Sequence, residues 1–276
     1  MGPACPPELA WAFDRERFMP MPAPGPGDWL DEHSEDGQDV EQFLADEPNR
    51  PGPPRDTIVL QPLLPSPTPM LPDADEQLDY LARFFGVQVR AAAPLQLSDD
   101  VLGARTRGGH TQWHASQILD AIEAQLPEDA YCSIAVTTVD LYPEPSWNFV
   151  FGLARLQRRV GVFSLARHDA AFFGRDASDV ALVRRRGLGV LAHEVAHMFG
   201  MQHCVYHRCL LNGSNTQAEA DRSPLHLCAV CLRKLHLLVG FDPRARYEAL
   251  HGFYRAHGLA LEAGWIELQL EAAARA

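Results

Sequence analysis

An eleven-residue pattern of histidines in the second half of the chain restricts the fold more than any other feature. It reads HEVAHMFGMQH from His193 to His203. Residues four apart lie on one face of a helix, so His193 and His197 can each place a ring nitrogen on one metal ion. A helix from about residue 178 to 199, capped by Ser178 or Asp176, is predicted by apolar residues at helical spacing: Val183, Leu188, Leu191 and Val195.

Gly200 explains how the third histidine could reach the same ion. A helix cannot turn back within one further turn unless a residue adopts an unusual backbone conformation, and glycine enters the left-handed region without a Cβ clash. We therefore predict that the chain leaves the helix there and brings His203 to His193 and His197. Three imidazoles leave a fourth zinc position for water, which is typical of a catalytic site.

Glu194 follows the first histidine and is the predicted general base. Zinc lowers the pKa of bound water from about 15.7 to about 7, and a carboxylate beside the metal can accept the proton. Glu194 would then return this proton to the leaving amine. The motif thus predicts a zinc-dependent metallopeptidase. The alternatives are a catalytically inactive, zinc-stabilised peptide-binding protein, hydrolysis of a non-peptide amide, and histidines that bind no metal.

Four cysteines follow the histidines within a short stretch, in two close pairs: Cys204 with Cys209, and Cys228 with Cys231. Four thiolates suit a closed tetrahedral zinc site with Zn–S distances of about 2.3 Å, which has a structural role. Because Cys204 directly follows His203, this zinc would fix the backbone that presents the third histidine. The alternatives are a redox pair, four free thiols, or His207 or His226 in place of one thiolate.

The first 55 residues differ in composition from the rest of the chain. They hold 11 of the 22 prolines, and their 12 acidic and 4 basic residues supply eight of the 12 net negative charges. Proline blocks helix continuation, but Val40, Phe43 and Leu44 stand at helical spacing. We predict an extended arm with a short docked helix, and disorder is the alternative.

The acidic balance also limits the partners. A net charge of −12 argues against a non-specific nucleic-acid binder. No apolar run is long enough to predict a membrane span, and the first residues lack the pattern of a secretory signal. We therefore expect a monomeric cytoplasmic protein whose partner is a peptide or protein substrate.

Strands and helices are expected to alternate ahead of the histidine helix. The expected strands cover residues 58–60, 87–89, 132–141, 148–152 and 159–165, and the expected helices cover 78–85 and 115–126. Two more helical segments end the chain. The pattern predicts an α/β fold in three parts: an arm (1–55), a catalytic subdomain with the sheet and the histidine helix (56–200), and a C-terminal subdomain with the third histidine, the cysteines and the last helices (201–276).

Together these motifs resemble the archaemetzincins, a branch of the metzincin metallopeptidases. The resemblance covers roughly residues 56–270 and is carried by HEVAHMFGMQHC at 193–204, Cys209, NGSN at 212–215, the Cys228–Cys231 pair, and the upstream stretches DLYP, WNFVFG and GVFS. It implies a metzincin-like zincin fold, with a twisted, mostly parallel sheet and helices. It also implies two zinc ions, one catalytic and one structural.

The resemblance further implies that a strand lining the active-site cleft binds extended substrate by strand addition. Residues 148–152 are our candidate, and an ordinary core or edge strand is the alternative. One position departs from the metzincin pattern, because the methionine of the turn beneath the zinc would fall at Leu211. Leucine nearly conserves the volume of methionine, so we expect the packing to survive.

Overall fold

The computed structural model describes residues 5–275 of the chain, which fall into two compact units. The first, here called the terminal unit, contains the N-terminal residues up to Asn49, Arg83–Gly86 and Gly200–Ala276. The second, here called the sheet unit, contains Arg50–Ala82 and Val87–Phe199. The division into an arm and two subdomains stays a prediction.

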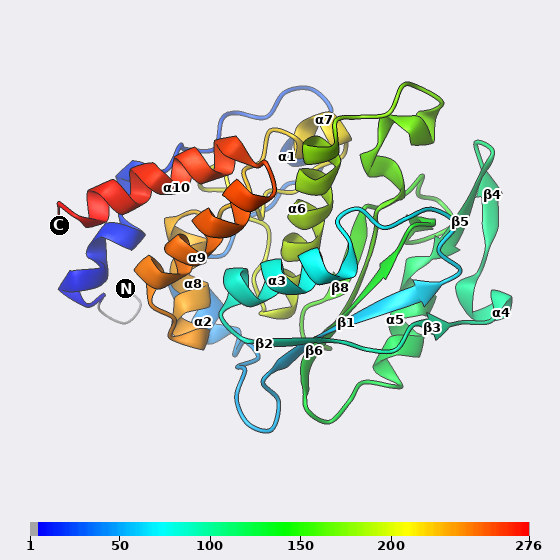
Figure 1. The fold of residues 1–276 in the computed structure, drawn as a ribbon, viewed down its shortest axis with the longest axis horizontal. Helices are drawn as coiled ribbons and strands as arrows, with labels where there is room; N and C mark the ends of the chain where they lie inside the picture. Colours follow the sequence, from blue (N-terminus) through cyan, green and yellow to red (C-terminus); the bar gives the residue numbers. More distant parts are fainter. Residues whose placement is uncertain (1–4, 276) are drawn as a thin grey trace. The chain divides into compact units, whose positions relative to one another are not determined.

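The sheet unit is built on a mostly parallel sheet, as predicted (Figure 1). The strand order is β2 (Gln88–Ala91), β1 (Thr57–Leu64), β6 (Ala130–Thr137), β9 (Val160–Ser164), β8 (Gly152–Arg155). All neighbours on this path are parallel except β8, which runs antiparallel to β9. The short β3 (Leu95–Gln96) also pairs with β1, and α3 (Ala74–Phe85) connects β1 to β2. A second sheet contains β4 (Arg105–Arg107), β5 (His110–His114) and β7 (Asp140–Tyr142).

Helices cover both faces of the main sheet, which is why β6 is buried along its whole length. On one face, Val160 and Val162 of β9 pack in a core with Ile118 from α5 (Ala115–Glu123). Alternate strand residues point to the other face, where a Cβ added at Gly161 would lie 3.4 Å from Met198 of α6 (Val180–Met198). The histidine helix therefore lies directly on the central strands.

The start and the end of α6 follow from specific contacts. Asp179 caps the helix by accepting hydrogen bonds from the N–H groups of residues 181 and 182, so the predicted caps Ser178 and Asp176 are wrong. At the other end, the Tyr131 hydroxyl donates to the carbonyl of Met198 at 3.2 Å. Gly200 then has a φ of 83°, as predicted for the residue that ends the helix.

Two predicted strands differ from the structure. The expected strand 132–141 is divided into β6 and β7. The expected strand 148–152 is wrong except at its last residue, where β8 begins. Before β8 the pairing is irregular. Gln112 donates to the carbonyl of Asn148 at 2.9 Å, and Arg105 donates to the preceding carbonyl, that of Trp147, at 2.7 Å. Val150 forms only an isolated bridge with Leu141, and the carbonyl of Phe151 accepts from the N–H of Ser164 at 2.8 Å.

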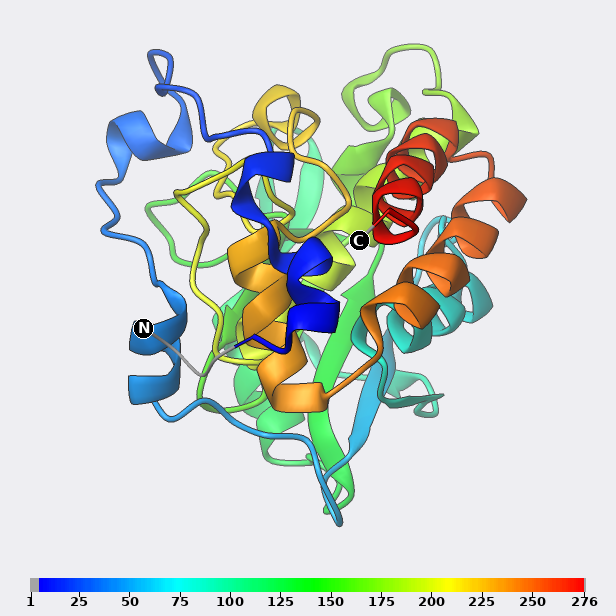
Figure 2. The same ribbon diagram turned by 90° about the vertical axis from the view of Figure 1, so that its left-hand side faces the viewer.

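The terminal unit is helical and includes the N-terminal arm (Figure 2). Its long helices are α8 (Ala229–Val239), α9 (Pro243–Ala256) and α10 (Ala260–Ala273). The shorter elements of this unit are η1 (Pro7–Phe13), η2 (Arg15–Arg17), α1 (Trp29–Glu32), α2 (Val40–Ala45) and α7 (Gln217–Ala220). The 3-10 helix η1 packs on α8 and α10, and Figure 2 shows this dark blue segment beside the orange α8.

The arm is attached to this unit at several points. The predicted docked helix is present as α2, which packs on α8 and buries Phe43 completely. Further back in the arm, Pro20 forms an antiparallel bridge with His207. Two backbone hydrogen bonds flank this bridge, from Met21 to the carbonyl of Tyr206 and from Arg208 to that of Met19. No helix within the described residues is long and apolar enough to cross a membrane.

Candidate metal centres

The first two histidines of the motif lie one turn apart on α6 with their ε nitrogens facing each other. The Nε2 atoms of His193 and His197 are 3.0 Å apart, and the ring centroids are 4.6 Å apart. Two nitrogens bound to a tetrahedral zinc at about 2.0–2.1 Å lie roughly 3.4 Å from each other. The helix alone thus supplies two ligand atoms at nearly the separation that zinc requires.

The third histidine joins this pair. Ligand atoms of His193, His197 and His203 all lie within 4.8 Å of one another. All three donors are imidazoles, the ligand type that a catalytic zinc accepts while keeping one position for water. The three imidazoles are thus a donor set that fits zinc, and their role as its ligands stays a prediction.

Glu194 is the only carboxylate within the motif, and its side chain is just 6% exposed. Burial raises the pKa of this carboxyl to about 8. The side chain lies against β8, where a Cβ added at Gly152 would be 2.4 Å from the Glu194 Oε1 atom. A glycine at position 152 is thus required for the present position of Glu194, a role that no local sequence pattern indicates.

His203 has partners from the arm that sequence reasoning missed. Its Nδ1 atom lies 2.8 Å from the Glu35 Oε1 atom, and the ring of Trp29 meets the imidazole edge to face with centroids 5.1 Å apart. Burial opposes ionisation of Glu35, but the hydrogen bonds that its carboxylate accepts from His203 and Trp29 favour the charged form, so the pKa of this carboxyl is lowered. No motif could reveal a pair that is 168 residues apart.

The four cysteines form the second group, entirely within the terminal unit. All four are buried, none is in a disulfide, and their sulfur atoms lie within 4.8 Å of one another. Cys204 and Cys228 are 3.6 Å apart at sulfur, and the backbone N–H of Cys228 donates to the sulfur of Cys209. Thiolates on a tetrahedral zinc at about 2.3 Å lie roughly 3.8 Å apart, so the group fits a structural zinc.

The two histidines considered as replacements for a thiolate have other surroundings. His226 stacks on Trp265 with ring centroids 3.6 Å apart and an interplanar angle of 6°. His207 packs against the edge of Phe18. Among the described residues, the metal-binding group at this place consists of the four cysteines alone. This composition favours the four-thiolate site over the sites with His207 or His226.

The loop between the cysteine pairs is ordered by a buried amide. Asn212 donates through Nδ2 to the carbonyls of Cys204 and His207, and its Oδ1 accepts from the N–H of Cys209. The preceding residue, Leu211, is fully buried, and its carbonyl accepts from the N–H of Cys204 at 2.8 Å. The turn at the expected methionine position is therefore held by backbone and amide contacts that do not depend on a thioether.

Because of these contacts, replacing Leu211 with methionine should have little effect. The two side chains have similar volumes, so we expect the free energy of unfolding to change by less than about 1.5 kcal/mol. Zinc content, measured by elemental analysis, should stay the same. A large fall in melting temperature or the loss of a zinc ion in L211M would show that the leucine itself shapes the turn.

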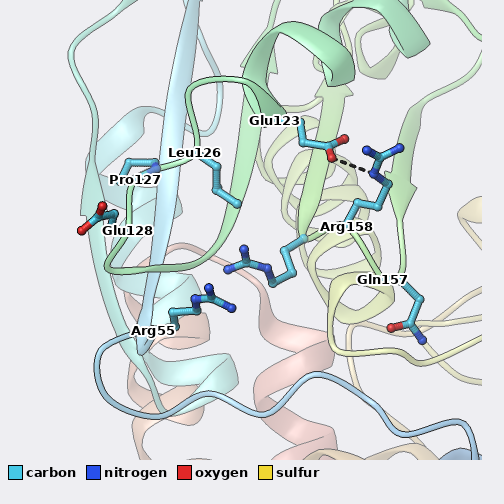
Figure 3. Close-up of a pocket in the computed structure, with 8 residues that line it drawn as sticks. Arg55, Glu123, Leu126, Pro127, Glu128, Gln157 and Arg158 are labelled. Carbon is cyan, nitrogen blue, oxygen red and sulfur yellow. Dashed lines mark ion pairs between the residues drawn. The ribbon is translucent and has the colours of Figure 1, made fainter.

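A cavity of about 480 Å³ lies elsewhere in the sheet unit (Figure 3). Its walls are polar, and Arg158 forms an ion pair with Glu123 at 2.6 Å across one side. The lining residues are Arg55, Glu123, Leu126, Pro127, Glu128, Gln157, Arg158 and Arg159. It contains no histidine, no cysteine and none of the motif residues, so we assign it no part in the metal chemistry.

Comparison with known proteins places these sites in context. A family model described as peptidase family M54 matches residues 111–237, which include Glu194 and all seven predicted zinc ligands. Archaemetzincin-2 from Homo sapiens is 35% identical over 265 residues, covering 84% of this chain and 73% of that protein. Archaemetzincin-1 from Homo sapiens is 32% identical and covers 83% of this chain and 52% of that protein.

Solved structures show the same relationship. The crystal structure of archaemetzincin from Methanopyrus kandleri is similar with a TM-score of 0.55 and 26% identity, covering 69% of this chain and 99% of that one. A zinc-dependent peptidase from Methanocorpusculum labreanum is similar with a TM-score of 0.52 and 25% identity, covering 64% of this chain and 99% of that one.

Proposed function

Since this chain belongs to the archaemetzincins, peptidase family M54, we propose that it hydrolyses peptide bonds with Glu194 as the general base. By family it is a zinc metallopeptidase. Its three-histidine and four-cysteine groups are consistent with one catalytic and one structural zinc ion. The proposal concerns the roles of individual residues: His193, His197 and His203 as catalytic ligands, and the cysteines as structural ligands.

The observation that carries this proposal is the position of Glu194 against an edge strand. On the main-sheet path β8 has one neighbour, β9, and it runs antiparallel to it. An edge strand presents N–H and C=O groups that an extended peptide can pair with by strand addition. The Glu194 side chain lies directly against Gly152 at the start of this strand. A peptide paired with β8 would therefore pass beside the proposed base.

Each residue then has one task in the reaction. When bound, zinc would polarise the carbonyl of the substrate and acidify a water molecule. Glu194 accepts the proton of the attacking water at its carboxylate and delivers it to the nitrogen of the leaving amine. Its low exposure keeps bulk water from competing for the carboxylate. β8 holds the substrate backbone extended, so that its carbonyl carbon faces the water molecule from which Glu194 accepts the proton.

The direct test is a cleavage assay on the full chain. Zinc-loaded protein and chelator-treated protein would be incubated with a diverse peptide library, and the products identified by mass spectrometry. We expect cleavage that depends on zinc and returns when zinc is added back. Peptides that are retained intact by the zinc-loaded protein would instead favour the binding protein without catalysis.

Replacing Gly152 with alanine tests the contact between Glu194 and β8. The new Cβ would lie 2.4 Å from Oε1 and 2.6 Å from Cγ of Glu194, so the carboxylate must move. A displacement of about 1 Å can cost roughly 100-fold in rate, so we expect kcat/KM to fall by at least about tenfold at unchanged zinc content. Gly52→Ala is the matched control, because a Cβ there meets nothing within 4 Å. Wild-type kcat/KM in G152A would show that this contact does not position the base.

A further inference from the structure

The arm places a carboxylate on the back of the third histidine. Glu35 Oε1 lies 2.8 Å from Nδ1 of His203, the ring nitrogen on the other side of the imidazole from Nε2. An ionised carboxylate only accepts hydrogen bonds, so Nδ1 must carry the hydrogen. The neutral imidazole then has its lone pair on Nε2, the form in which it binds a metal.

A tryptophan fixes the position of this carboxylate. The Trp29 indole donates through Nε1 to the same Oε1 atom of Glu35 at 2.9 Å. The indole itself is held in place, because the Trp29 backbone N–H donates to Glu219 at 2.8 Å and the ring lies against Gly213. A Cβ at Gly213 would be only 2.4 Å from the ring. Glu35 is thus oriented by a side chain that has little room to move.

Gln38, three residues after Glu35 in the arm, holds the backbone of the loop that carries His203. Gln38 is 2% exposed, and its amide donates to the carbonyl of Gly200 at 3.3 Å and accepts from the N–H of Gln202 at 3.2 Å. The same amide oxygen accepts from the buried Lys234 ammonium at 3.0 Å. The arm therefore contacts this loop at two places: the loop backbone just before His203, and the ring of His203.

We propose that Glu35 is a positioning residue for the catalytic zinc, which fixes the tautomer and the ring orientation of His203. Ligating histidines generally donate their second N–H to such a carboxylate, and removal of that partner weakens metal binding by about 10- to 100-fold. The arm lies outside the residues that the family model matches, so it adds a part to the zinc site beyond the matched motif. This inference rests on zinc binding by the three histidines and is independent of which bond the enzyme cleaves.

The test measures zinc affinity in the full chain with both sites loaded. Glu35→Ala removes the acceptor, whereas Glu35→Gln keeps an amide oxygen that can still accept from Nδ1. Asp36→Ala is the matched control, because it removes the neighbouring, exposed carboxylate. Chelator competition would follow zinc, and cobalt substitution would separate the sites, because thiolate and imidazole ligands give cobalt different visible spectra. The melting temperature would report on the fold.

We expect the three-histidine site of E35A to bind zinc about 10- to 100-fold more weakly than wild type, with E35Q in between and D36A unchanged. The four-cysteine site should keep its cobalt spectrum in every variant. Equal affinity in E35A and D36A would overturn the proposal. If E35A does not fold, E35Q becomes the test, because a zinc affinity of E35Q equal to that of the wild type would also overturn the proposal. Failure of peptide cleavage in the wild type would contradict the proposed function alone, because zinc affinity is measured separately.

Discussion

Replacing Glu194 with alanine should lower kcat for peptide cleavage by about 10²- to 10⁴-fold, the usual contribution of general acid–base catalysis. The change removes the only carboxylate within the motif and leaves all three histidines in place. Zinc should stay bound at both sites, because Glu194 is not among the residues grouped as ligands. The measurements are kcat on a cleaved peptide and zinc content by elemental analysis.

The interpretation of this variant depends on its controls. Glu128→Ala removes an exposed carboxylate from the same unit and should keep wild-type activity. Glu194 is buried, so the melting temperature must show that the alanine variant is folded before its rate is compared. If E194A is folded and zinc-loaded and still cleaves peptides at the wild-type rate, then Glu194 is not the base. Weaker peptide binding at unchanged kcat would make it a binding residue instead.

The sequence predicts most of the metal chemistry because the information is local. The turn of a helix brings His193 and His197 together, and Gly200 provides the positive φ that ends this helix. Both relationships depend on neighbouring residues, so the residue spacing is enough to predict them. The cysteine cluster is predictable for the same reason. Each pair is close in sequence, and four thiolates in two close pairs are typical of a structural zinc site.

Long-range pairing explains what the sequence did not predict. The apolar residues around Phe149 look like a strand, but the ladder with β9 begins only at Gly152. Arg105, more than 40 residues earlier, binds the carbonyl of Asn148 and so satisfies a backbone group that a strand would have paired. Such a contact depends on the tertiary fold, which no periodicity in the segment itself can indicate.

The arm shows the same limit at the active site. The spacing of Val40, Phe43 and Leu44 predicted the helix that is present as α2, but not the short helices η1, η2 and α1 ahead of it. However, nothing in its sequence distinguishes Glu35 from the other carboxylates nearby. Its position at His203 results from the packing of the arm within the terminal unit, where Pro20 also forms a bridge with His207. Sequence patterns can therefore indicate candidate metal ligands more readily than distant residues, such as Glu35, that contact them.

Replacing Cys228 with serine should have the largest effect on stability. Structural zinc sites contribute roughly 10–16 kcal/mol in zinc-finger peptides, which exceeds the net stability of most domains. Cys228 is also the N-cap residue of α8, but serine is among the preferred residues at this position. The substitution should therefore preserve the helix cap and remove one thiolate, so the loss can be assigned to the metal.

We expect C228S to be largely insoluble, or soluble with a much lower melting temperature and with zinc bound to the three histidines at most. Activity should fall as well, because Cys204 of this site directly follows His203 and fixes its backbone. Cys5→Ser is the matched control, since the Cys5 thiol lies outside the four-cysteine group and its loss should leave zinc content and melting temperature unchanged. A soluble, active C228S with two zinc ions per chain would contradict the four-thiolate site. The remaining interpretations of the cluster would then be a redox pair or free thiols. Reduction and thiol labelling of the wild type would distinguish these two.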